Sequence, residues 1–140
     1  MSKSSFMSKL IVSKDDASST WTIEEPFDYY SELAETVFHI PVGMVTDFAS
    51  IPRILWNILP PAEGPYAKAA VVHDFLYAHK GKIYGQKLDR GTCDRILLEA
   101  MEVSRTGWMQ RHSIYRAVRM FGWAVWKNKP DNNPATLEVT

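Results

Sequence analysis

The sequence predicts an α+β fold, a small N-terminal antiparallel sheet followed by about four helices, the central two forming an antiparallel pair. Three observations lead to this prediction. Before Asp47, short β-branched and aromatic runs alternate with turn residues, as strands do. After Asp47, apolar residues recur at helical spacing. The length of 140 residues, of which 46% are hydrophobic, suits a single core.

Four runs before Asp47 have the composition of strands. They are residues 10–12, 20–23, 27–30 and 36–40. The first two flank a cluster of Asp, Ala and Ser and are expected to pair as a hairpin. Residues 1–8 are polar, and we expect them to be frayed.

Capping and breaking residues divide the rest of the chain into helices. The expected helices span residues 53–59, 65–78, 89–104 and 108–126. Asp89 or Thr92 caps the third of them, and residues 83–88 are expected to form a loop. Because this connection is short, the second and third helices should pack antiparallel.

Composition limits the class of protein. We expect one domain over residues 1–127 and an extended tail over residues 128–140. Sixteen basic residues balance sixteen acidic ones, so we expect no specific binding to nucleic acid. The single cysteine permits no internal disulfide, and we find neither a signal peptide nor a transmembrane segment. Synthesis in the cytoplasm is expected.

The charges are unevenly distributed along the chain. Residues 105–129 contain six basic side chains and no acidic one, whereas acidic residues are concentrated in residues 24–35. A domain with this asymmetry could dock onto an acidic partner or onto its own copy, so oligomers are possible. The simpler interpretation is a solvated basic helix face.

The first candidate for chemistry is the pair His73-Asp74, which lies within an apolar helical run. Tyr77 follows His73 by four residues and therefore shares its helix face. A neutral histidine can act as a general base, and the neighbouring carboxylate can bind a metal ion. The alternative is a core histidine that is satisfied by the backbone, with Asp74 in a salt bridge.

The second candidate is Asp94, near the start of the next helix. An antiparallel helix pair can bring it level with His73, where its carboxylate would orient the imidazole. The alternative is a carboxylate that serves the helix dipole. The third candidate, Asp47, lies in a turn and could be a second metal ligand, or it could only hold the turn together.

These residues resemble a family of small phage and prophage proteins, the domain of unknown function 1353. The motifs that carry the resemblance are Thr46-Asp47-Phe48-Ala49-Ser50-Ile51-Pro52-Arg53, His73-Asp74-Phe75-Leu76-Tyr77, Asp94, Tyr115-Arg116-Ala117-Val118-Arg119 and Phe121-Gly122. They cover roughly residues 37–126. The resemblance implies a phage origin, with synthesis in the host cytoplasm and possible association with the virion. It implies no activity.

A second, local resemblance is to the two central helices of secreted phospholipases A2. It rests on His73-Asp74 with Tyr77, followed by Asp94 between Cys93 and Arg95. It implies His73 as the base, Asp94 as the orienting carboxylate and Asp74 as a ligand of Ca²⁺, which would polarise an ester carbonyl. The chain departs from those enzymes because it lacks their disulfides and their glycine-rich calcium loop.

Three functions follow, and the alternatives stay open here. The first is a calcium-dependent hydrolase of the cell envelope, acting on lipid or another ester, with His73, Asp94 and Tyr77 as catalytic residues and Asp74 and Asp47 as metal ligands. The second is a virion or tail component in which a buried His-Asp network fixes the helices and the basic fourth helix contacts neighbouring subunits. A third, less favoured, is an inhibitor of a host defence protein. An enzyme needs His73 at a water-accessible cleft, whereas a structural network would be closed.

Overall fold

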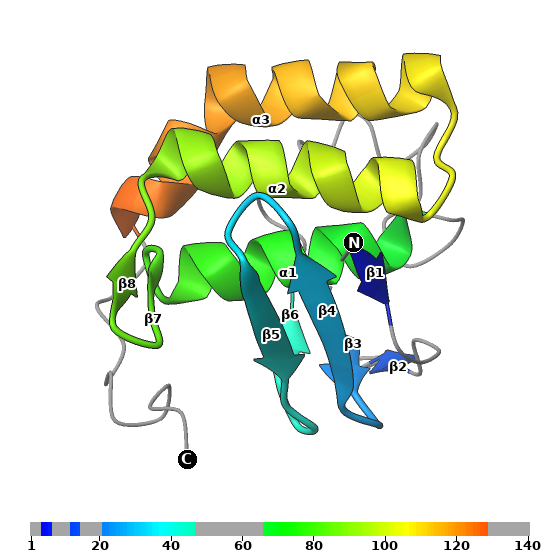
Figure 1. The fold of residues 1–140 in the computed structure, drawn as a ribbon, viewed down its shortest axis with the longest axis vertical. Helices are drawn as coiled ribbons and strands as arrows, with labels where there is room; N and C mark the ends of the chain where they lie inside the picture. The colour runs from blue at the N-terminus through cyan, green and yellow to red at the C-terminus, as the bar shows by residue number, and fades with distance from the viewer. Residues whose placement is uncertain (1–3, 7–11, 15–20, 47–65, 129–140) are drawn as a thin grey trace.

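The α+β class predicted from the sequence is confirmed in the computed structural model, which describes residues 4–6, 12–14, 21–46 and 66–128. Short strands precede three helices, and the helices lie side by side (Figure 1). The helices are α1 (Ala67–Ala78), α2 (Arg90–Val103) and α3 (Trp108–Asn128). The helix expected at residues 53–59 and the tail expected after residue 128 lie outside the described residues.

Two small antiparallel sheets replace the single one that the sequence predicts. One has the order β1 (Ser5–Phe6), β4 (Phe27–Ser31), β5 (Thr36–Ile40). The other has the order β2 (Val12–Lys14), β3 (Trp21–Ile23), β6 (Val45–Thr46). The predicted hairpin is present, because β2 and β3 pair antiparallel. Residues 5–6 were expected to be frayed, but they pair with Tyr29 and Tyr30 of β4.

The connection between α1 and α2 is a β-hairpin, so the prediction of a loop there is wrong. Strands β7 (Lys82–Ile83) and β8 (Gln86–Lys87) pair across Tyr84 and Gly85. Both turn residues have positive φ, 52° and 79°, which is the backbone of a two-residue hairpin turn. Gly81 lies between the end of α1 and this hairpin, and a Cβ there would clash with the carbonyl oxygen of Leu88.

The three helices differ in how much of their surface is covered. Ten of the twelve residues of α1 are buried, so this helix has no solvated face. Helix α2 buries one stripe and begins at the predicted cap, where the Asp89 carboxylate accepts a hydrogen bond from the Thr92 backbone N–H at 2.7 Å. Helix α3 lies at the outer edge of the helical layer, beside α2 and away from strands β1 to β6 (Figure 1).

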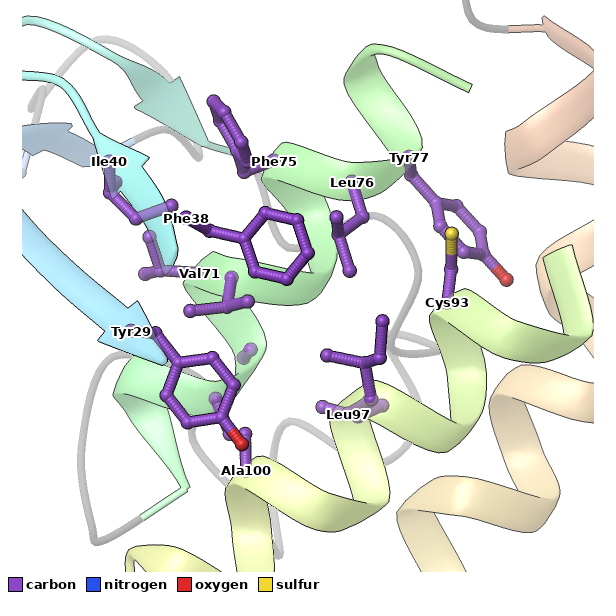
Figure 2. Packing of buried hydrophobic residues seen from close by; sticks show 14 of the residues in the cluster. Tyr29, Phe38, Ile40, Val71, Phe75, Leu76, Tyr77, Cys93, Leu97 and Ala100 are labelled. Carbon is purple, nitrogen blue, oxygen red and sulfur yellow. The ribbon is translucent and has the colours of Figure 1, made fainter. Parts of the chain in front are cut away.

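The core lies between the sheet of β1, β4 and β5 and the first two helices. Figure 2 shows side chains of β4 and β5 facing those of α1 and α2. The residues labelled there include Tyr29 and Phe38 from the strands, Val71 and Leu76 from α1, and Leu97 and Ala100 from α2. This packing fixes α1 and α2 relative to each other, and with them the polar side chains that they carry. None of the helices in the described parts of the chain has both the length and the apolar character needed to span a membrane.

Candidate functional site

The candidate site begins on α1, where His73 and Tyr77 lie one turn apart on the same face. Their rings are in contact, with centroids 4.2 Å apart. Both residues are fully buried, because α1 is covered on all sides. A buried imidazole and a buried phenol are stable only with hydrogen-bonding partners. The residues that contact this face of α1 therefore complete the site.

Asp94 of α2 contacts the face of α1 that carries His73 and Tyr77, as the sequence predicts. Its Oδ1 atom lies 2.8 Å from Nε2 of His73 and accepts a hydrogen bond from the Tyr77 hydroxyl at 2.6 Å. The Asp94 side chain has no exposed surface, and that of His73 is only 1% exposed. The antiparallel packing of α1 and α2 thus brings all three predicted catalytic residues into one buried cluster.

Two arginines, which the sequence analysis did not single out for the site, complete the surroundings of Asp94. Arg119 of α3 donates to Oδ2 of Asp94 at 2.7 Å, and Arg90 of α2 donates to the same atom at 3.2 Å. Arg90 also donates to the backbone carbonyls of Val118 and Arg119. The carboxylate consequently has a donor from each of the three helices.

The charge of Asp94 determines the hydrogen-bonding direction of His73. Burial on its own would raise the pKa of the Asp94 carboxyl, but hydrogen bonds from His73, Tyr77 and Arg119 outweigh burial and lower it. An ionised carboxylate only accepts hydrogen bonds, so Nε2 of His73 must carry the hydrogen. In a neutral imidazole, Nδ1 would then be the nitrogen able to accept a proton.

The sequence offered a partial signal for the arginines. Arg90 precedes Asp94 by four residues, a spacing at which opposite charges on a helix are neighbours. Arg119 belongs to the motif Tyr115-Arg116-Ala117-Val118-Arg119, but a basic helix was interpreted as a solvated face. The Arg119 side chain is 39% exposed, yet its guanidinium group is paired with Asp94. The interpretation as a solvated face therefore does not hold for that group.

The predicted metal ligands are not assembled in the described residues. Asp74 is buried on α1 beside His73, and Asp47 lies outside the described residues. Within residues 4–6, 12–14, 21–46 and 66–128, no three His, Cys, Asp or Glu side chains are grouped closely enough to hold a metal ion. Ca²⁺ takes six to eight oxygen ligands. These side chains alone therefore do not make up a calcium site, and the assignment of Asp74 and Asp47 as ligands stays a prediction because Asp47 lies outside the described residues.

A second His-Asp pair lies on the surface of the sheet. Nδ1 of His39 on β5 lies 2.8 Å from Oδ1 of Asp28 on β4, the same separation as in the buried pair. The side chains are 59% and 39% exposed, so water competes for this contact. The two pairs share their chemistry and differ in burial, which makes His39 a matched control for His73.

Comparison with known proteins gives a family and no activity. The sequence model of a family described as "Protein of unknown function (DUF1353)" matches residues 21–118. The chain is also similar to the uncharacterized protein y4jT of Sinorhizobium fredii (strain NBRC 101917 / NGR234), with 43% identity over 44 residues. That match covers 31% of this chain and only 13% of y4jT. No solved structure matches the chain.

Proposed function

We propose that this chain, which belongs to the DUF1353 family of proteins of unknown function, is a phage-borne structural protein whose His73-Asp94 network holds its helices together without catalysing a reaction. The observation that carries the proposal is the burial of both partners. The phage origin rests on the resemblance of the motifs described above. Association with a virion or tail is part of this proposal.

The surroundings of Asp94 support a structural role. A general base must reach the proton that it removes, directly or through one water molecule, and the His73 side chain is almost completely enclosed. The Asp94 carboxylate already has four donors, which use its lone pairs. Two guanidinium groups on Oδ2 also offset the negative charge that an orienting carboxylate would lend to a catalytic histidine.

The network also explains why polar groups remain in this core. Asp94 is bonded to side chains of α1, α2 and α3. A fully satisfied buried network favours the one packing in which all its hydrogen bonds are made. Apolar packing alone would discriminate less between neighbouring registers of the three helices. The network therefore specifies the helix arrangement.

The test compares the two His-Asp pairs. His73→Ala should lower the free energy of unfolding by about 2 to 4 kcal/mol, because it removes a buried hydrogen bond to a charged group and leaves a cavity. His39→Ala should cost less than about 1 kcal/mol. His73→Gln, which keeps an N–H donor, should cost less than His73→Ala. Equal stability of His73→Ala and His39→Ala would refute the structural role.

The second candidate function is a His-Asp hydrolase acting on lipid or another ester of the cell envelope. Asp94 at Nε2 and the Tyr77 hydroxyl on the same carboxylate oxygen favour it. This is the arrangement that the resemblance to phospholipases A2 implies, with His73 as base and Asp94 as the orienting group. The proposal that Ca²⁺ assists needs ligands besides Asp74, since the described residues do not supply them.

Release of fatty acid from mixed phospholipid micelles separates the two functions. The wild type is assayed with calcium and with a chelator, beside the His73→Gln variant, whose folding is checked by circular dichroism. The structural proposal predicts no release from any sample. Release by the wild type that is lost in folded His73→Gln would establish the hydrolase and overturn the structural proposal. Its dependence on calcium would then decide whether a metal takes part.

A further inference from the structure

The outward face of α3 combines large apolar side chains with basic ones. Five large hydrophobic residues of this helix are more than half exposed: Trp108, Met109, Met120, Phe121 and Trp123. Only three other large hydrophobic residues in the described part of the chain are exposed to a comparable degree, and these are scattered over Leu33, Val42 and Val45. Such a concentration on one element marks an interaction surface.

The helical positions place three of these five residues, Met109, Met120 and Trp123, on one side of the helix, with Trp108 and Phe121 flanking it. Residues 109, 113, 116, 120, 123 and 127 follow one another at intervals of four and three, which places them along one side of the helix. All six are exposed. We call this row the α3 stripe; it contains Met109, Ser113, Arg116, Met120, Trp123 and Lys127. The opposite side of α3, with Ile114 and Val118, is buried in the core.

The charge of α3 restricts what can cover the stripe. The helix carries four basic residues and no acidic one between Trp108 and Asn128. Arg119 is held by Asp94, but Arg116 and Lys127 lie on the stripe itself. Two copies of the stripe placed face to face would bring like charges together. The surface therefore suits an anionic partner with an apolar layer beneath its charges.

We propose that the α3 stripe docks the protein onto the surface of an anionic lipid bilayer. Trp123 and the two methionines would enter the interface, where tryptophan is favoured, while Arg116 and Lys127 would meet lipid phosphates. The helix is 21 residues long and lies at the edge of the molecule (Figure 1), so it can lie flat on a membrane. This inference depends on α3 alone and not on either role of His73.

Sedimentation with vesicles tests the proposal. Wild-type protein should bind vesicles of phosphatidylcholine and phosphatidylglycerol in equal amounts, and should bind vesicles of pure phosphatidylcholine at least tenfold more weakly. Arg116→Gln should weaken binding to the anionic vesicles about fivefold, since one basic residue near such a surface contributes about that factor. Trp123→Ser should weaken it further, and the blue shift of tryptophan fluorescence on binding should shrink.

Controls are available outside α3. Lys87 of β8 and Val42 are exposed and do not belong to the α3 stripe, so Lys87→Gln and Val42→Ser make the same kinds of change and should leave binding unaltered. The proposal is overturned if the wild type fails to bind anionic vesicles, or if the α3 variants bind as well as the controls. Self-association of the wild type that Trp123→Ser abolishes, without vesicle binding, would assign the stripe to a second copy instead.

Discussion

Gly122 of α3 lies directly against Tyr77 of α1: a Cβ atom at position 122 would be 2.6 Å from the Tyr77 hydroxyl oxygen and 3.3 Å from Nη1 of Arg90. Gly122 is buried. The hydroxyl cannot move aside freely, because it donates to Asp94 at 2.6 Å. The absence of a side chain at position 122 thus allows α3 to approach closely enough for Arg119 to reach Asp94.

Gly122→Ala should therefore destabilise the protein by about 1 to 3 kcal/mol, as overpacking in a core does. In an unobstructed helix the same substitution stabilises by up to about 1 kcal/mol. Gly91→Ala in α2 is the matched control, because its nearest neighbour would be an Arg119 atom at 3.6 Å, an ordinary contact. Urea unfolding measures both. Stabilisation by Gly122→Ala equal to that by Gly91→Ala would show that the helices do not approach as described.

Tyr77→Phe should lower the free energy of unfolding by about 1 to 2 kcal/mol, because it removes one of the two donors to Oδ1 of Asp94. The ring can keep its edge-to-face contact with Trp126, at 5.1 Å between centroids. Tyr115→Phe, at a half-buried position of α3, should change stability by less than about 0.5 kcal/mol. Thermal unfolding of the two variants decides the matter, and equal effects would show that the Tyr77 hydroxyl contributes nothing to the network.

The fold could be predicted where local signals are strong. The cap of α2 at Asp89 and the end of α1 near Gly81 follow from residue types that favour those positions. The hairpin of β7 and β8 was missed because Tyr84, unlike Asn or Asp, gives no signal for a left-handed backbone. Strand β1 was missed because it is only two residues long and pairs with the distant strand β4, so its local sequence carries no pattern that predicts a strand.

In the candidate site, too, contacts set by local sequence signals could be predicted and contacts set by long-range packing could not. His73, Tyr77 and Asp94 could be grouped from sequence because two helices joined by a short connection must lie side by side. Arg119 could not be assigned to the site, because no local sequence pattern indicates how α3 packs against α1 and α2. The burial of His73 was equally hidden, since the polarity of a residue does not reveal what covers it. The prediction that Asp47 joins the site remains untested, because it lies outside the described residues.

Stability should fall in acid as Asp94 is protonated. Burial opposes ionisation, but hydrogen bonds from His73, Tyr77 and Arg119 bring the pKa of the folded carboxyl below its ordinary value of 3.8. The unfolded chain then binds this proton more readily than the folded one. The stabilisation is therefore complete above the unfolded pKa and is lost as the pH falls through that value to the folded pKa.

Carbon NMR of the carboxyl carbons tests this dependence directly, and Asp94 should remain mainly ionised at pH 3.8. Asp89→Asn serves as a background, because it removes another carboxyl group whose pKa is lowered and keeps a side-chain acceptor for the helix cap. The free energy of unfolding of this variant should still decline as the pH falls below about 4. An Asp94 carboxyl that titrates above 3.8 would contradict the described network.

Cys93 should report on the integrity of the network because it precedes Asp94 and is fully buried. Burial, together with the negative charges of Asp94 and Asp89, raises the pKa of its thiol to about 12. Since the thiolate is the reactive form, a disulfide reagent should label the folded protein only through opening of the structure. Labelling should be fast in denaturant and much slower in buffer.

His73→Ala should accelerate labelling of Cys93 in buffer at least tenfold, whereas His39→Ala should leave the rate within about twofold of the wild type, in line with the energies expected for the two pairs. Fast labelling of the native wild type would show that α2 is not held closed around Asp94.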